Sequence, residues 1–281
     1  MLDKIEQLEH SLVQHGDSSD RVYVIKLAKE DRFTLPRQLE TLAEENDRGK
    51  IVAKVPLWGV PTFENEGYRK EAFVPDLYNG RTGAYFMCKY FDPSRRELSR
   101  EVQAKMKQNL NLAKRAEAKR ESLPDDLELR ELGDQDAAQL TEIYDKVFEH
   151  YPFPIHEEDY IRETMDSNIR YFGVFKKDQL VAASSAEMDK EGENVEMTDF
   201  ATDPEASGQR LAAHLLRAME SEMRKSGIKV AFTIARALSP GINITFGRNK
   251  YAYGGTLINN TKISSGIESM NVWHKKLVVN K

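Results

Sequence analysis

The stretch that decides the fold is Thr198 to Leu216, TDFATDPEASGQRLAAHLL. A strand-like run ends at Asp203-Pro204, and a helix with apolar residues at helical spacing follows a turn of small residues. The main-chain N–H groups of such a turn and of the first helical turn point to one place, where the helix dipole adds positive potential. We therefore expect a phosphate group to bind at residues 207–212.

Composition and charge narrow the class of protein. Of the 281 residues, 40% are hydrophobic and 31% charged, which is typical of globular proteins. The net charge of −5 argues against nucleic acid as a partner, because that binding needs a basic surface. The single cysteine, Cys88, favours a reducing compartment, and no run suits a signal core or a membrane span. We expect a cytoplasmic protein with no membrane partner, and no histidine cluster indicates a metal.

Breaker-rich residues divide the chain into three predicted parts. Residues 1–91 form an α+β region, 92–126 a long charged helix with a linker, and 127–281 a larger domain. A narrow apolar stripe predicts the helix over Ser94–Glu121. The first part echoes the layout strand, helix, strand, strand of residues 229–273, which favours a partial internal repeat over a coincidence.

The third part alternates strands and helices in an order that predicts a mixed sheet with helices on both faces. Hairpin-joined strands come first, and a strand–helix–strand crossover lies in the middle. The expected elements are a strand at Leu127–Leu132, helices at Asp134–Glu149 and His156–Asp166, strands at Tyr171–Phe175, Gln179–Met188 and Asn194–Ala201, a long helix at Ser207–Lys225, a strand at Lys229–Ala235, a short helix at Pro240–Asn249, and strands at Tyr251–Ile258 and Ser269–Leu277.

This order of elements resembles the GNAT superfamily of N-acetyltransferases. The resemblance implies an α/β (α+β) fold with a mixed, mostly antiparallel sheet flanked by helices, and the first part of the chain as a partial GNAT-like repeat. In that family the loop after the fourth strand binds the diphosphate of acetyl-CoA with the pattern Arg/Gln-x-x-Gly-x-Gly/Ala. Ser207 replaces the usual Arg or Gln and Arg210 the central Gly, whereas Ala212 fits. The six loop residues are Ser207, Gly208, Gln209, Arg210, Leu211 and Ala212.

Longer phrases resemble the β-lysine N6-acetyltransferase family over about residues 21–277. They are Tyr151–Ile155, Glu196–Thr202, Thr233–Ala237, Asn259–Thr261, Glu268–Trp273 and, near the N-terminus, parts of Gly67–Met87. The resemblance implies transfer of acetyl from acetyl-CoA, as co-substrate, to the N6 amine of β-lysine, (3S)-3,6-diaminohexanoate. Two alternatives stay open: another small polyamine or amino acid as acceptor, and a non-catalytic acyl-CoA-binding module. The expected partner is a small-molecule amine, and the oligomeric state stays open, a homodimer included.

Acetyl transfer to an amine needs a base, because a lysine-type ammonium has a pKa of about 10.4 and is not nucleophilic at neutral pH. The resemblance implies Glu196 as this base. Asp199 should point to the opposite face of a regular strand, unless a bulge turns it toward the acceptor's second amine. Many GNAT enzymes protonate the leaving thiolate with a tyrosine, but Phe246 holds that place. Tyr251 is therefore the candidate acid, with Tyr253 or water as alternatives.

The remaining candidates contact the two substrates. The superfamily implies that main-chain groups of Phe200, Ala201 and Thr202 bind the pantetheine arm, and that Asn243 supplies a carboxamide to the coenzyme. A bidentate arginine suits the acceptor's carboxylate, and Arg236 is the candidate. Further contacts with the acceptor are expected from Tyr151 and Phe153 as pocket walls and from Asn259, Asn260 and Asn271 as amides, with turn chemistry as the alternative for the asparagines.

Overall fold

The computed structural model describes residues 3–118, 121–263 and 266–277. The N-terminal lobe, which we define as residues 3–91, is followed by a helix and then by the C-terminal lobe, residues 121–277. The N-terminal lobe contains β1 (Lys4–Leu8), β2 (Ser11–Gly16), β3 (Arg21–Lys26), α1 (Leu35–Glu45), β4 (Lys50–Pro56), α2 (Val60–Asn65), β5 (Arg69–Tyr78) and β6 (Thr82–Tyr90). The connecting helix is α3 (Arg100–Lys114). The C-terminal lobe contains β7 (Leu127–Glu131), α4 (Ala137–Val147), α5 (Glu158–Met165), β8 (Ile169–Lys176), β9 (Gln179–Asp189), β10 (Asn194–Thr202), α6 (Leu211–Lys225), β11 (Val230–Arg236), α7 (Pro240–Arg248), β12 (Ala252–Ile263) and β13 (Gly266–Lys276).

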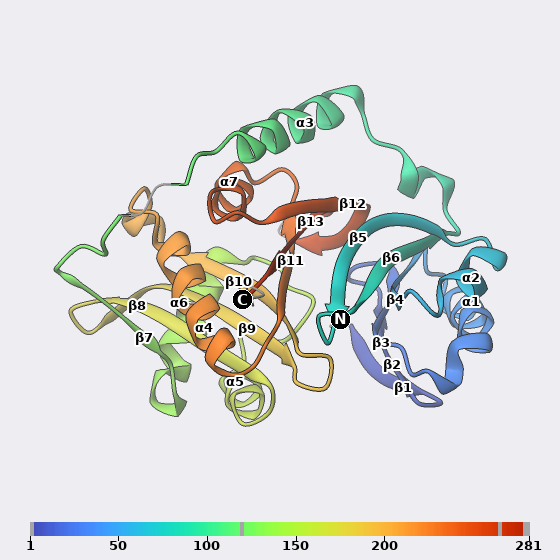
Figure 1. Cartoon of the computed structure of the whole chain (residues 1–281), viewed down its shortest axis with the longest axis horizontal. Coiled ribbons are helices and arrows are strands. Elements are labelled where there is room, and N and C mark those ends of the chain that lie inside the picture. The colour runs from blue at the N-terminus through green and yellow to red at the C-terminus, as the bar shows by residue number, and fades with distance from the viewer. Residues whose placement is uncertain (1–2, 119–120, 264–265, 278–281) are drawn as a thin grey trace.

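The two lobes share one 13-stranded sheet, which runs through the whole molecule (Figure 1). Its order is β1-β2-β3-β4-β6-β5-β12-β13-β11-β10-β9-β8-β7. The sheet is mixed and mostly antiparallel, as predicted, and among the described residues only β3–β4 and β10–β11 run parallel. Because the sheet is continuous, the predicted division of the chain at residues 91 and 126 stays a prediction.

The same topology occurs in both lobes. The order β3-β4-β6-β5 matches β10-β11-β13-β12, with the first pair parallel in each lobe. Helix α1 crosses between the parallel strands of the first lobe as α6 does in the second, and the short helices α2 and α7 follow in equivalent places. The predicted layout of strand, helix, strand, strand is therefore present twice.

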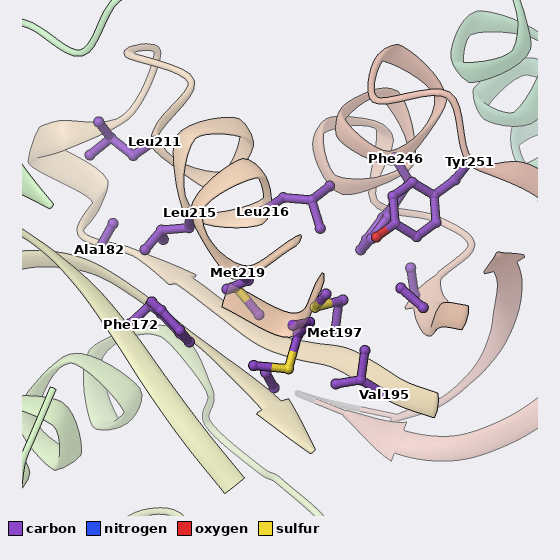
Figure 2. Close-up of a cluster of buried hydrophobic side chains, with 14 of the residues drawn as sticks. Phe172, Ala182, Val195, Met197, Leu211, Leu215, Leu216, Met219, Phe246 and Tyr251 are labelled. Carbon is purple, nitrogen blue, oxygen red and sulfur yellow. The ribbon is translucent and has the colours of Figure 1, made fainter. Parts of the chain in front are cut away.

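Helix α6 covers one face of the C-terminal sheet with the apolar stripe that the sequence predicted. Figure 2 shows Leu215 and Met219 of α6 directed at strand residues that include Phe172 and Met197. These side chains are almost fully buried, and burial of a large apolar side chain contributes roughly 1.5–3 kcal/mol. The helices α4 and α5 belong to a separate apolar cluster around Tyr144. The crossover helix is thus fixed by hydrophobic packing.

Three predicted boundaries were wrong. Helix α3 ends at Lys114 and not at Glu121, and its N-cap is Ser99, whose hydroxyl accepts the N–H of Val102. Helix α6 begins at Leu211, since residues 207–210 form a loop. Strand β12 extends beyond Ile258 to Ile263. The polar and charged residues at these ends favour neither continuation of the helix or strand nor its termination, so tertiary contacts set where the elements end.

The lobes are joined where β12 meets β5. One residue pair, Gly255 with Ala72, continues the ladder, and a Cβ on Gly255 would lie 2.2 Å from the carbonyl oxygen of Glu71. Lys50 is fully buried beside this pair and donates to the carbonyl oxygen of Ile258 (2.7 Å) and to Glu71 (3.2 Å). The main-chain N–H of Ile258 also donates to Glu71 at 3.1 Å. A close backbone approach and a buried ion pair therefore hold the two lobes in one register.

Helix α3 passes over the C-terminal lobe and packs on α7, as Figure 1 shows. The amide of Asn109 donates to the carbonyl oxygen of Ala237 at 3.2 Å. A Cβ on Gly247 of α7 would lie 2.1 Å from the carbonyl oxygen of Ala113, so only glycine permits this approach. Within the described ranges, none of the helices combines the length and apolar character that crossing a bilayer requires.

Candidate active site

The parallel strands β10 and β11 pair over only three residues and then separate. The pairs are Asn194–Val230, Val195–Ala231 and Glu196–Phe232. Beyond Glu196, β10 still pairs with β9 on its other edge, up to Thr202 opposite Ala182. The edge that faces β11 is therefore left without a strand partner in the described part of the chain. A gap of this kind leaves main-chain donors and acceptors free for an extended ligand.

The loop before α6 has the conformation of an anion site. Gly208 (φ +84°) and Arg210 (φ +58°) are both left-handed, and nothing lies within 4 Å of the place where a Cβ on Gly208 would be. In the described residues, the main-chain N–H groups of 208–212 make no hydrogen bond to the protein. Arg210 donates to Glu121 at 2.5 Å, which directs its side chain toward the linker. The donors of this loop are thus available to a diphosphate.

A cavity of about 980 Å³ lies between the two lobes. It is lined by Glu196 and Thr198 of β10 and by Phe232 and Ile234 of β11. Glu196 and Phe232 are the last paired residues before the strands separate, and Thr198 and Ile234 are the next residues on the same face of each strand. The cavity therefore opens directly at the parting of the strands, and Glu196 lies at this opening.

Residues from several elements complete the cavity wall. Tyr151 and Phe153, in the connection between α4 and α5, line it, and their expected contact with the acceptor stays a prediction. The N-terminal lobe adds Arg21 and Tyr23 of β3 and Lys54 of β4. Sequence reasoning missed these three, because they lie far from the recognisable phrases along the chain.

The cavity holds carboxylates with perturbed acidity. Burial raises the pKa of Glu196 to about 7, with the charge of Lys54 lowering it and that of Asp199 raising it further. Glu187 lies directly opposite Glu196 on β9, and burial together with its acidic neighbours raises the pKa of Glu187 well above its usual value. Sequence reasoning missed Glu187. The sequence could have indicated it: the segment Glu187–Glu196 begins and ends with glutamate, and a hairpin turn at its centre would place these two residues opposite each other.

A bulge turns Asp199 toward Tyr151 and Ser185, and Asp199 itself does not line the cavity. The β9–β10 register shifts between Thr198 and Ala201, and Asp199 has φ +54°. Its carboxylate accepts hydrogen bonds from Ser185 (2.5 Å) and from the hydroxyl of Tyr151. Burial raises the pKa of Asp199, although these hydrogen bonds oppose the rise. The bulge that the sequence left open is present, and Asp199 anchors a wall residue of the cavity.

Two predicted amide contacts were wrong. The amide nitrogen of Asn243 donates to the carbonyl oxygens of Arg236 (2.8 Å) and Ser239 (2.7 Å), and its oxygen accepts from Asn271 and Trp273, both at 2.9 Å. All four hydrogen-bonding positions of this amide are used. Asn271 is buried and shares the same network. Its oxygen accepts from the hydroxyl of Thr256 at 2.7 Å, and neither asparagine lines the cavity, so both tie α7 to β11 and β13 instead.

The predicted carboxylate contact and a third amide contact were also wrong. Arg236 forms a bidentate ion pair with Glu268 (3.1 and 2.5 Å) and does not line the cavity. Asn259 donates to the carbonyl oxygens of Arg95 (3.0 Å) and Glu97 (3.1 Å), so it holds the segment that precedes α3. The sequence showed suitable residue types, but their internal partners were visible only in the fold.

The candidate acid Tyr251 lies behind Phe246. The ring of Phe246 contacts Phe200 on one side (5.6 Å between centroids) and Tyr251 on the other (5.0 Å). Figure 2 shows Tyr251 beside Phe246 within the apolar cluster. Burial and then the charge of Glu220 raise the pKa of Tyr251 well above its usual value. Its hydroxyl is therefore protonated, as an acid requires, but the residue is 5% exposed and does not line the cavity, so its position does not support the predicted role at the reacting sulfur.

Comparison with known proteins identifies the family of this chain. The model of the Acetyltransferase (GNAT) domain matches residues 128–249. The chain belongs to the GNAT acetyltransferase family, whose members use acetyl-CoA, and it is an N-acetyltransferase. The resemblance inferred from the sequence is thereby confirmed.

Two relatives are similar over nearly their whole length. The beta-lysine N(6)-acetyltransferase of Methanococcus maripaludis is 38% identical over 98% of this chain and 99% of the relative. The enzyme of the same name from Methanosarcina mazei is 34% identical over 85% of this chain and 95% of the relative. Among solved structures, the ribosomal-protein-S18-alanine N-acetyltransferase of Escherichia coli covers 55% of this chain and 96% of its own, at 14% identity and a TM-score of 0.48.

The raised pKa of Glu196 predicts a pH-dependent stability. A carboxyl with a pKa of about 7 when folded and 4.5 when unfolded loses stability as pH rises through this window, because the charged form is buried. Glu196→Gln removes that charge. We expect Glu196→Gln to raise Tm at pH 8 and to change it little at pH 4.5, measured by thermal denaturation. The exposed Glu142→Gln is the control, and equal shifts for Glu196→Gln at both pH values would contradict the assignment.

Proposed function

We propose that the protein transfers acetyl from acetyl-CoA to the N6 amine of β-lysine. One observation carries the proposal: the cavity between the lobes opens where β10 and β11 separate, with Glu196 at the opening. A thioester held between the strands would meet an amine held in the cavity at this carboxylate. The names of the two relatives, which match over nearly full length, support β-lysine as the acceptor.

The coenzyme end of the site uses main-chain groups. The unpartnered N–H groups of residues 208–212 suit the diphosphate, helped by the dipole of α6. The free edge of β10 at Phe200, Ala201 and Thr202 suits the amides of the pantetheine arm, which would pair with it as a short extra strand. Fixing the thioester in this way removes most of the entropic barrier to its reaction with a bound amine.

Glu196 is the proposed base. Its pKa of about 7 lets it take a proton from the N6 ammonium near neutral pH, which leaves a neutral amine. The nitrogen then attacks the thioester carbon, the N–C bond forms and the C–S bond breaks. The remaining surplus proton of the nitrogen neutralises the thiolate, and Glu196 later releases its own proton to solvent. The products are the amide, free CoA and one proton.

The charges of the cavity suit a diamine. Glu187 and Glu196 share its wall with Asp189 at the end of β9 and Glu191 of the β9–β10 turn, so carboxylates can replace the hydration water of the acceptor's ammonium groups there. The proposal needs a small-molecule amine and acetyl-CoA, and no metal. Cys88 is buried and unpaired among the described residues, which agrees with a reducing compartment, and we place the enzyme in the cytoplasm.

Release of CoA across a panel of amines tests the function. We expect β-lysine to give a kcat/KM well above those of α-lysine, ornithine and putrescine, because the two relatives that match over nearly their whole length are named for this acceptor. The measurement is thiol release at saturating acetyl-CoA. Similar rates on all four amines would defeat the assigned specificity, and binding of acetyl-CoA without release of CoA for any amine would indicate a binding module.

The role of Glu196 is tested by the pH dependence of the rate. We expect Glu196→Gln to lower kcat on β-lysine about 100-fold at pH 7, and less at higher pH, since the amine then loses its proton without help. In the wild type, kcat/KM should rise with pH through about 7 as the carboxylate forms. Glu142→Gln serves again as the control. A loss that is the same at every pH would remove Glu196 as the base.

The coenzyme loop is tested by adding one negative charge. Gln209 is exposed in the loop, and Gln209→Glu places a carboxylate beside the proposed diphosphate. We expect about a tenfold higher KM for acetyl-CoA with little change in kcat, because like charges repel. The control is the same substitution at the exposed Gln179, at the start of β9. An unchanged KM in Gln209→Glu places the diphosphate elsewhere.

A further inference from the structure

Arg21 of the N-terminal lobe is a buried cation with no carboxylate at ion-pair distance among the described residues. Its guanidinium lies over the ring of Tyr23, 4.8 Å from the centroid, and its charge lowers the pKa of Glu196 across the cavity. Arg21 is only 5% exposed and lines the cavity. One guanidinium nitrogen, Nη1, donates to the carbonyl oxygen of Asn260 at 3.2 Å, whereas Nε is buried and has no partner in the described residues. Its positive charge is not balanced by an ion pair with any described side chain. A buried unpaired charge is costly, so a site of this kind is typical of a group that awaits an anion.

The contrast with Arg95 shows what a structural arginine looks like in this protein. Arg95 is similarly buried, at 6% exposed, but it forms an ion pair with Asp20. It also donates to the carbonyl oxygens of Asp20 (2.8 Å) and Ser19 (3.0 Å). Arg95 does not line the cavity, whereas Arg21 does. The fold therefore satisfies one buried guanidinium internally and leaves the other facing an open space.

Asn260 adds a neighbouring acceptor. Its side chain is 1% exposed and lines the same cavity, and its carboxamide oxygen Oδ1 is buried without a hydrogen-bond partner in the described residues. The bond from Arg21 to the main chain of Asn260 places the two residues side by side. A free cationic donor and a free neutral acceptor thus lie together, on the wall contributed by β3 and β12.

We infer that Arg21 and Asn260 form the subsite for the head group of the acceptor, an inference that rests on the proposed function. The guanidinium of Arg21 binds the carboxylate, and Oδ1 of Asn260 accepts from the ammonium on the third carbon. In a β-amino acid these two groups are separated by a single methylene, so adjacent complementary partners recognise them together. The N-terminal lobe, through Arg21, accordingly helps to select the substrate that the C-terminal lobe acetylates.

Two analogues separate the two contacts. 1,4-Diaminopentane is β-lysine without its carboxylate, and 6-aminohexanoate is β-lysine without its second amine. We expect Arg21→Met to lower kcat/KM about 100-fold for β-lysine and 6-aminohexanoate, mainly through KM, and to leave 1,4-diaminopentane nearly unchanged. Asn260→Ala should lower kcat/KM for β-lysine about tenfold and leave kcat/KM for 6-aminohexanoate nearly unchanged. The exposed Arg37→Met, in the same lobe, is the control and should change none of the three.

Other readouts separate recognition from a structural role. Arg21→Met removes an unpaired buried charge, so its Tm should stay the same or rise, whereas a structural arginine would lower Tm and reduce activity on all three amines alike. Calorimetric titration of β-lysine in the presence of CoA reports the subsite without turnover, and Arg21→Met should weaken binding about 100-fold. Equal losses on all three amines, or undiminished binding in Arg21→Met, overturn this inference while the proposed function stands. A wild-type protein that releases no CoA with β-lysine overturns the function itself.

Discussion

The early end of the pairing between two parallel strands is the constraint on which the rest of the site depends. Strands β10 and β11 separate after Glu196 and Phe232, and α6, which crosses between them, begins beside the gap with its first N–H groups free. The gap persists because each strand is held on its other edge, β10 by β9 and β11 by β13. Hydrophobic packing of α6 on the sheet fixes the loop that precedes it (Figure 2). Stability of the sheet and opening of the site thus come from the same hydrogen-bond pattern.

The N-terminal lobe covers the site and has the same topology as the C-terminal lobe. Its helix α1 has Pro36 in the first turn, where a proline supplies no N–H, so the anion-binding end of the crossover helix is not reproduced there. What this lobe contributes is a wall with Arg21, Tyr23 and Lys54. The buried pair of Lys50 and Glu71 at the junction holds that wall in position over the gap. One topology therefore occurs twice, with different chemistry in each copy.

Acidity in the cavity follows from this closure. Because Glu187 and Glu196 lie between the two lobes, burial disfavours the charged forms of these carboxylates, and Lys54 offsets the effect only partly. Both lobes act on Glu196, because Lys54 and Arg21 of the N-terminal lobe lower its pKa whereas Asp199 of the C-terminal lobe raises it.

The sequence by itself determined the order of elements in the C-terminal lobe and the crossover at residues 198–216, because local periodicity and turn residues carry that information. The family resemblance added the coenzyme loop and Glu196, which stay proposals. The sequence also indicated the repeated layout. Only the tertiary structure decided which polar side chains were free: Asn243, Asn271, Arg236 and Asn259 proved to be occupied, whereas Arg21 and Asn260 did not. The physical reason is that a hydrogen-bonding group is available only if the fold gives it no internal partner, and those partners come from strands distant in the chain.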